Sequence, residues 1–526
     1  MDSNVAELLT RAAAQEADRI AMTEAVSGRT VTWSGLDDLA QRVVQGLSDA
    51  GMVAGYRVMI AAGNSIEFVA AYFGALRAGM VVVPVNPRSA TGELIRMLAD
   101  SGTRMVIADQ TTIAVVRIAV GGLGDAMVAS GHEPAARPRI VSIGTTLEPG
   151  ERSWDQLVGN HGRLTPLRED PENLAVLLYT SGTSGRPRAA MLSHRAMLAN
   201  VEQVALVDPP MITGRDVVLG VLPLFHVYGL NAVLGQVVRQ HARMVLVNGF
   251  DAEGSLDLIE DEAISVVPVA PPVFAYWMQV AGLEERLGPV RLVLSGSAPL
   301  DPDLTAAFSR RTNVAIHQGY GLTEAAPVVT STLCSKVPNP RSVGAALPGI
   351  EIRLVGEDGR APLDEDAGEI QVRGSNMFSG YWPDGADGPD LEGWWPTGDV
   401  GYLDPTGDLY LVDRLKELVI VSGFNVYPSE VEEVVSELPE VAGAAVIGVD
   451  DERTGEAVVA YVVPTAAGAS DALVDVVRAH CEQRLARFKQ PSVIHVVERL
   501  PLTGTGKVQK GRLRATERRR ALGLLE

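Results

Sequence analysis

Short apolar runs alternate with longer amphipathic segments over most of the chain. Arg57–Ile60 and Met105–Ala108 are apolar and short, as buried strands are. Glu67–Ala78 and Thr91–Asp100 are long enough for helices and repeat their apolar residues with helical spacing. Strands separated by helix-length segments are typical of a layered α/β architecture with largely parallel sheets.

The pattern changes after about Gly368, where short strands and turns continue to Val412. A second set of strands and helices begins at Leu418, with helices expected over Ser429–Ser436 and Ala472–Leu485. The sequence therefore predicts two domains: a large N-terminal domain of layered α/β subdomains, residues 1–414, and a small C-terminal α+β domain, residues 415–526.

One apolar stretch, Val217–Val238, is long enough to span a bilayer. Pro223, His226 and Asn231 interrupt it, so a buried strand followed by a buried helix explains it better than a membrane span. The first residues contain acidic side chains and no long apolar core, so we expect no signal peptide.

Composition narrows the function classes. The chain has 526 residues, 46% hydrophobic and 21% charged, which fits a folded protein of at least two domains. Its net charge of −20 has the wrong sign for a general nucleic-acid binder. Two cysteines exclude a disulfide framework or a Cys-rich zinc site, and they favour a reducing, cytoplasmic location.

The segment Tyr179–Arg188 is the strongest local signal. It follows an apolar strand at Leu174–Leu178 and combines hydroxyl side chains and glycines with two arginines. Exposed backbone N–H groups, hydroxyl donors and guanidinium groups are suited to a loop around a polyphosphate. The alternative, a flexible Ser/Gly linker, requires neither the preceding strand nor the arginines.

Three further segments carry weaker signals. In His317–Glu324 two glycines flank Tyr320, which would let a flat ring approach and stack. Asp399 could accept hydrogen bonds from two sugar hydroxyls, and Lys507 on a Gly/Thr loop could supply a point charge to another domain. Taken singly, these are equally well a turn, a turn-capping aspartate and a surface lysine.

In this order and spacing, the segments resemble the acyl-adenylate-forming (ANL) superfamily, which includes acyl-CoA synthetases, adenylation domains and luciferases. The resemblance covers almost the whole chain and extends to Asn86-Pro87, Leu222–His226, Ser295–Pro299 and Ser342–Gly344. Val421–Pro428 is similar to bacterial fatty-acyl-CoA synthetases.

The resemblance implies roles for residues of both domains. ATP contacts are expected from Thr180, Ser181, Gly182, Thr183, Ser184, Gly185, Arg188, Ser297, Ala298, Gln318, Gly319, Tyr320, Asp399 and Arg414. Catalytic roles are implied for Thr323 at the α-phosphate, Glu324 as a Mg²⁺ ligand, His226 as a gate between acid and ATP, and Lys507 as the adenylation lysine. The hinge would be Lys416, the CoA path would pass Gly423 and Phe424, and the acyl pocket would include Tyr228, Pro327 and Val328.

The implied activity is ATP-dependent activation of a carboxylic acid to acyl-AMP, with pyrophosphate release and transfer to coenzyme A. The segment after Phe225 lacks the aspartate that binds the amine in amino-acid-activating relatives. Ile420 and Ser422 stand where plant-type aryl ligases usually have lysines. A fatty acid is therefore favoured. A fatty acyl-AMP ligase loading a carrier protein, an aryl-CoA ligase and a non-catalytic nucleotide-binding homologue remain alternatives.

The phosphate loop departs from the family pattern at its end. Arg188 and Ala189 stand where relatives usually have lysine and glycine. Arginine keeps the charge but is a planar fork, and Ala189 would be strained if its backbone needed a positive φ. We expect this departure to affect the rate more than the function.

Overall fold

The computed structural model describes the greater part of the chain. The described residues are 3–129, 136–160, 162, 170–181, 187–297, 300, 302–337, 339–356, 360, 368–414, 419–426, 428–465, 472–501, 508 and 510–521. They divide into two compact units. Unit 1 is Met1–Pro87, Leu98–Leu178 and Ala189–Asp413, and unit 2 is Arg88–Met97, Tyr179–Arg188 and Arg414–Glu526. The domain boundary expected after Arg414 stays a prediction.

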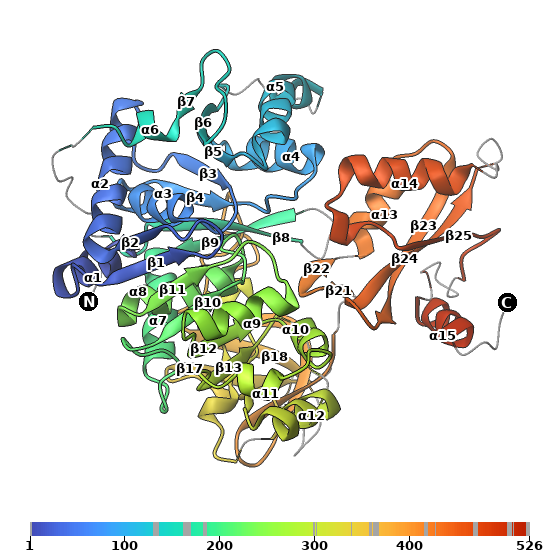
Figure 1. The fold of residues 1–526 in the computed structure, drawn as a ribbon. Coiled ribbons are helices and arrows are strands. Elements are labelled where there is room, and N and C mark those ends of the chain that lie inside the picture. The colour runs from blue at the N-terminus through green and yellow to red at the C-terminus, as the bar shows by residue number, and fades with distance from the viewer. Residues whose placement is uncertain are drawn as a thin grey trace. The chain divides into compact units, whose positions relative to one another are not determined.

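Two seven-stranded sheets and one six-stranded sheet form in the described residues up to Arg414 (Figure 1). The first has the order β14 (Ile316–Gln318), β13 (Leu292–Ser295), β12 (Val266–Val269), β10 (Val217–Gly220), β11 (Arg243–Leu246), β1 (Ile20–Glu24) and β2 (Thr30–Thr32). The second has the order β7 (Arg152–Ser153), β6 (Arg139–Ile143), β5 (Met105–Asp109), β3 (Arg57–Ala61), β4 (Val81–Pro84), β8 (Leu174–Ser181) and β9 (Pro187–Ser193). The third has the order β15 (Thr330–Ser331), β16 (Gly344–Ala346), β20 (Asp408–Arg414), β19 (Trp395–Leu403), β18 (Gly368–Gly374) and β17 (Ile350–Val355).

Helices separate the strands along this part of the chain. They are α1 (Glu7–Gln15), α2 (Trp33–Asp49), α3 (Ile66–Arg77), α4 (Thr91–Ser101), α5 (Ile113–Ala129), α6 (Trp154–Leu157), α7 (His194–Ala205), α8 (Gln236–Gln240), α9 (Ala252–Asp261), α10 (Pro272–Trp277), α11 (Leu283–Arg286) and α12 (Pro302–Thr312), with the short helices η1 (Tyr228–Gly235), η2 (Thr323–Ala325) and η3 (Thr332–Cys334). The apolar run at Val217–Val238 is a strand followed by a helix, as predicted, although its first helical segment, η1, is π-helical rather than α-helical. Across the described ranges, no helix has both the length and the apolar character needed to cross a membrane.

Capping and close packing explain why α2 and α3 form where they do. The Thr32 hydroxyl accepts from the Gly35 N–H at the start of α2, and the Ser65 hydroxyl caps α3 through the Phe68 N–H, each at 3.1 Å. A Cβ on Gly74 of α3 would lie 2.6 Å from the Val43 Cβ of α2. The glycine therefore allows the two helices to approach closely within the main core.

The C-terminal part of unit 2 is a small sheet covered by helices on both faces (Figure 1). Its elements are β21 (Val419–Val421), β22 (Phe424–Val426), β23 (Val441–Asp451), β24 (Gly455–Pro464), β25 (Val493–Val496), α13 (Pro428–Ser436), α14 (Leu473–Arg484), η4 (Arg487–Lys489) and α15 (Lys510–Ala521). Val446 and Val458 pack with α13 and α14, whereas Ile447 and Val459 pack with Leu513 of α15. Alternate residues of each strand thus face opposite helices, and the predicted α/β fold class with a small α+β domain is confirmed.

Candidate functional site

Parallel strands bring three predicted segments of unit 1 to one sheet edge. β10, β12, β13 and β14 pair in parallel, so their carboxyl ends share an edge. The segment containing His226 follows β10, Ser297 follows β13, and Tyr320 follows β14. Open α/β sheets bind ligands outside the carboxyl ends of their strands, which makes this edge the candidate site.

Tyr320 and Asp399 are joined across two sheets. The Tyr320 hydroxyl donates to Asp399 Oδ2 at 2.6 Å, although the two residues are 79 positions apart. Tyr320 is 8% exposed, and Asp399 lies in β19 of the six-stranded sheet. The predicted adenine-side and ribose-side residues therefore meet in the structure.

The two glycines around Tyr320 are closely packed by the chain's own backbone. A Cβ on Gly319 would lie 2.7 Å from the Thr330 carbonyl oxygen, and one on Gly321 would lie 2.4 Å from the Pro327 carbonyl oxygen. The chain's own backbone therefore occupies the place where a side chain at either position would have to lie. Both glycines are thus required by internal packing, while an adenine contact at Gly319 stays a prediction.

Glu324 is held by a residue that the sequence did not indicate. The Tyr381 hydroxyl donates to Glu324 Oε1 at 2.5 Å, and both side chains are buried, at 9% and 8% exposure. The Phe378 N–H donates to the Glu324 carbonyl at 2.8 Å.

The same edge contains the predicted acyl-pocket residues. A Cβ on Gly296 would lie 3.0 Å from Cε1 of Tyr228, so the Tyr228 ring covers the end of β13. Asn200 donates to the Val328 carbonyl at 2.8 Å, and buried Asn231 donates to the Ala326 carbonyl at 2.6 Å. These two asparagines, which the sequence did not indicate, fix the turn before and after Pro327.

Burial keeps the side chains of His226 and Tyr228 neutral at pH 7. It lowers the pKa of His226 to about 4, and the His226 Nδ1 accepts the Tyr228 N–H at 3.3 Å. Burial also raises the pKa of the Tyr228 phenol above its ordinary value. A neutral imidazole beside a neutral phenol leaves this wall uncharged, which is compatible with an apolar acid.

The other predicted residues of unit 1 are placed by local bonds. Ser297 has φ +73°, Gln318 donates through Nε2 to the Pro340 carbonyl at 2.8 Å, and Thr323 begins η2. Ala298 lies outside the described residues.

Unit 2 contains the phosphate-loop ends and the C-terminal residues. The Thr180 hydroxyl donates to the Arg188 carbonyl at 3.4 Å. Ser422 and Gly423 both have positive φ, +52° and +81°, and form the two-residue turn between β21 and β22. Phe424 stacks on Phe488 at 4.6 Å, so its ring already has a packing role.

Part of the predicted site cannot be placed. Outside the described residues lie Gly182, Thr183, Ser184, Gly185, Lys416 and Lys507, together with the side chains of Ser181 and Arg414. Ala189 is described: it lies in β9, is 1% exposed and is not among the residues with positive φ. The backbone strain that we considered at Ala189 is therefore absent from this structure.

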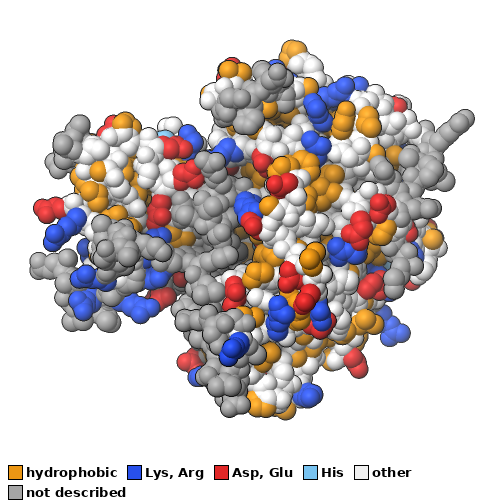
Figure 2. Space-filling model, turned by 180° about the vertical axis from the view of Figure 1, so that it is seen from behind, with side chains coloured by type: hydrophobic (Ala, Val, Ile, Leu, Met, Phe, Trp, Pro, Cys, Tyr) orange, Lys and Arg blue, Asp and Glu red, His pale blue; other side chains and the backbone are white. Residues whose placement is uncertain are grey.

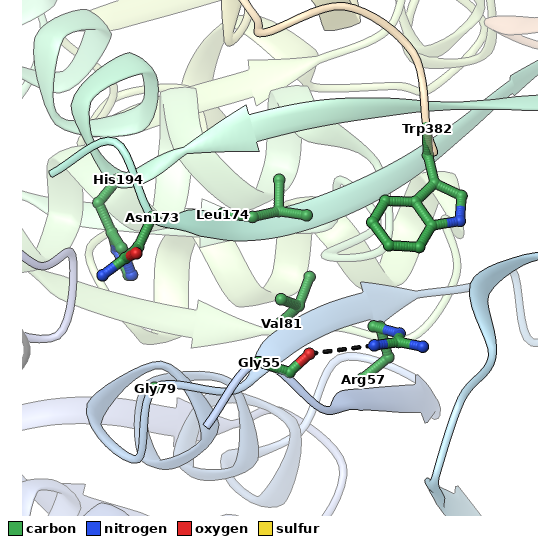
Figure 3. Close-up of a pocket in the computed structure, with 8 residues that line it drawn as sticks. All are labelled: Gly55, Arg57, Gly79, Val81, Asn173, Leu174, His194 and Trp382. Atoms are coloured by element: carbon green, nitrogen blue, oxygen red, sulfur yellow. Dashed lines mark hydrogen bonds between the residues drawn. The ribbon is translucent and has the colours of Figure 1, made fainter. Parts of the chain in front are cut away.

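A cavity of about 210 Å³ lies elsewhere in unit 1 (Figure 3). Trp382 and Arg57 form one end, Asn173 and His194 form the other, and Leu174 and Val81 lie between them. Arg57 donates to the carbonyls of Ser101, Gly55 and Gly102, which matches a packing role. None of the predicted site residues lines this cavity.

Acidic and basic side chains are interspersed on the face shown in Figure 2. In the part of the chain that the structure covers, no three His, Cys, Asp or Glu side chains gather to hold a metal ion.

Comparison with known proteins matches both parts of the chain to one family. Residues 9–382 match the family model for AMP-binding enzymes, and residues 430–507 match the model for their C-terminal domain. A 4-coumarate–CoA ligase-like protein of Oryza sativa subsp. japonica is 32% identical over 97% of this chain and 92% of its own length. A long-chain-fatty-acid–CoA ligase of Bacillus subtilis (strain 168) is 30% identical over 96% of this chain and 93% of its own. The solved structure of the amide bond synthetase McbA from Marinactinospora thermotolerans has a TM-score of 0.84 at 27% identity, and the match covers 98% of this chain and 99% of that one.

Proposed function

The chain belongs to the AMP-binding enzyme family and is an AMP-forming acid–CoA ligase, and from that premise we propose that it is an acyl-CoA synthetase for fatty acids. The first half-reaction joins the acid to the α-phosphate of ATP and releases pyrophosphate. The second passes the acyl group to the thiol of coenzyme A.

The observation that carries the nucleotide-binding part of this proposal is the pair of tyrosine–carboxylate bonds, Tyr320–Asp399 and Tyr381–Glu324. Asp399 would accept hydrogen bonds from the ribose hydroxyls, beside an adenine stacked on Tyr320. The 2.6 Å hydrogen bond from the Tyr320 hydroxyl to Asp399 supports this arrangement. Glu324 would face the phosphates, with Thr323 next to it at the start of η2. One nucleotide would thus be held at its base, its sugar and its phosphates.

The residues fit a magnesium ion. Mg²⁺ is commonly bound by one or two carboxylates together with substrate phosphates, and Glu324 supplies a buried carboxylate that Tyr381 orients. When bound, the ion would neutralise phosphate charge. Glu324 would hold it.

The chain's own residues would then stabilise the charge that develops in the reaction and open the path for the thiol. Attack by a carboxylate on a phosphate brings two anions together, so a cation such as Lys507 would stabilise the charge that accumulates. Thr180 and Arg188 would contact the β- and γ-phosphates. A rotation of the C-terminal domain about Lys416 would remove Lys507 and open the thiol path past Gly423 and Phe424.

The predicted lining of the acyl pocket supports a fatty acid. Tyr228, Pro327 and Val328 would line it, and the pKa of His226, lowered to about 4, keeps the gate uncharged at neutral pH. A second candidate substrate class is aromatic acids. The Tyr228 ring lying over Gly296 would form a flat wall, and 4-coumarate–CoA ligases are among the relatives.

A panel of acids decides between these substrates. The full chain is incubated with ATP, Mg²⁺, CoA and either saturated fatty acids of increasing length or 4-coumarate, and pyrophosphate and acyl-CoA are measured. We expect kcat/KM to rise with chain length by up to about fourfold per methylene until the pocket ends, since each buried CH₂ contributes about 0.8 kcal/mol. A preference for 4-coumarate would assign the protein to the aryl-CoA ligases. If the acyl group reaches only a holo carrier protein, that protein and not CoA is the acceptor. A Glu324→Gln variant is the control for enzyme-dependent turnover.

A further inference from the structure

The hydroxyl of Tyr320 has a partner that ring stacking does not explain. A stacked base requires only the flat face of an aromatic residue, and phenylalanine would supply it. Here the hydroxyl donates to Asp399 Oδ2 at 2.6 Å, a short distance of the kind seen when the acceptor is ionised. The hydroxyl therefore acts on the carboxylate rather than on the base.

Both ends of this bond are fixed by further hydrogen bonds. The Tyr320 N–H donates to the Thr330 hydroxyl at 3.2 Å, and its carbonyl accepts from the Val329 N–H at 2.9 Å. The Asp399 N–H donates to the Thr397 hydroxyl at 3.1 Å, and that hydroxyl donates to the Ile370 carbonyl at 2.8 Å. With both backbones held, the bond from the phenol restricts the rotation of the Asp399 carboxylate.

We propose that Tyr320 is a positioning residue for Asp399, and that its hydroxyl supports recognition of the ribose hydroxyls independently of base stacking. This inference rests on the proposed function, in which Asp399 binds the ribose. A carboxylate that accepts from sugar hydroxyls must present its oxygens in one plane, and orienting it before binding avoids the entropy cost of ordering it afterwards.

The test is a thermodynamic cycle that removes the Tyr320 hydroxyl from the protein and the 2′- and 3′-hydroxyls from the nucleotide, singly and together. ATP and 2′,3′-dideoxy-ATP are titrated calorimetrically into the full chain with Mg²⁺ and without acid, for wild type and Tyr320→Phe. We expect Tyr320→Phe to weaken ATP binding about tenfold, the usual effect of losing a hydrogen bond to a charged group. It should weaken dideoxy-ATP binding less than about twofold, because the contacts that Asp399 makes are already missing there.

A matched variant separates this role from loss of any buried phenol. Tyr381→Phe removes the same group from an equally buried tyrosine, whose hydroxyl donates to Glu324 Oε1 at 2.5 Å. Its effect should be equal for the two nucleotides. Asp399→Asn should remove the preference for ATP over dideoxy-ATP, and adding Tyr320→Phe to it should change little.

Equal weakening of both nucleotides in Tyr320→Phe would overturn the proposal and leave Tyr320 as a stacking residue. Thermal unfolding measured beside each titration shows whether the variant is folded. If it is not, p-fluorophenylalanine at position 320 removes the donor while keeping the ring's size, and the same comparison applies. Failure of the wild type to bind either nucleotide would refute the proposed function instead, so the two failures are distinguishable.

Discussion

A buried neutral histidine should make unit 1 sensitive to acid. His194 is 2% exposed, its Nδ1 accepts the Val5 N–H at 3.1 Å, and burial lowers its pKa from 6.5 to about 4. Because the folded pKa lies below the unfolded one, the unfolded chain binds the proton first as the pH falls. The contribution of neutral His194 to the free energy of unfolding is therefore fully present above pH 6.5 and is lost progressively between pH 6.5 and 4.

The size of the effect follows from the shift. One group with these two pKa values lowers the free energy of unfolding by about 2 kcal/mol at pH 5. The loss reaches roughly 3 kcal/mol once the group is protonated in both the folded and the unfolded state. His194→Asn keeps an acceptor oxygen near the Nδ1 position and removes the titration. We expect the free energy of unfolding of wild type to fall by about 2 kcal/mol more than that of His194→Asn between pH 7 and pH 5. His226, whose pKa is lowered to a similar value, titrates in both proteins and cancels.

Tryptophan emission during urea unfolding is a suitable assay because it reports on unit 1 alone. All six tryptophans lie there: Trp33, Trp154, Trp277, Trp382, Trp394 and Trp395. Parallel pH dependence in the two proteins would refute the reasoning. A variant that is equally weakened at both pH values would show that the His194 ring matters for packing and not for its charge.

Four further substitutions have expected outcomes. Gly296→Ala places a methyl group 3.0 Å from the Tyr228 ring. We expect kcat/KM for the longest accepted acid to fall about fourfold relative to the shortest, with KM for ATP unchanged. A uniform fall for all acids would place the contact outside the acyl pocket. Gly344→Ala, at φ +87° with a β15 backbone atom 2.0 Å from the new Cβ, should lose more than about 4 kcal/mol of stability in chemical denaturation. Gly407→Ala, at φ +92° in open space, should lose only about 1–2 kcal/mol, and similar losses at both glycines would contradict the steric reasoning. Lys507→Ala should abolish adenylate formation, measured as pyrophosphate release, yet spare thioester formation from supplied acyl-AMP; equal loss of both counts against two separate conformations.

Local periodicity was sufficient for most elements but not for the contacts between them. The run at Arg57–Ile60 and the amphipathic segment at Glu67–Ala78 became β3 and α3 within a residue or so, because burial of one face determines both. The Tyr381–Glu324 bond joins residues 57 positions apart and left no local pattern. The π-helical geometry of η1 has no distinct periodicity signal in so short a segment. The sequence showed the glycines at 319 and 321, but not the carbonyl groups of Thr330 and Pro327 that pack against them.

The parallel arrangement of β10, β12, β13 and β14 also has an evolutionary consequence. The strands contribute buried aliphatic residues to the core, whereas the predicted acid-binding residues lie outside them. Tyr228 begins η1, and Pro327 and Val328 follow η2. Connecting segments can change without altering the strand pairing beneath them. A lineage can therefore change the acid that it accepts by exchanging side chains at this edge while the strand pairing is inherited intact. The diversity among relatives, from 4-coumarate to long-chain fatty acids, is the outcome that such a division of labour permits.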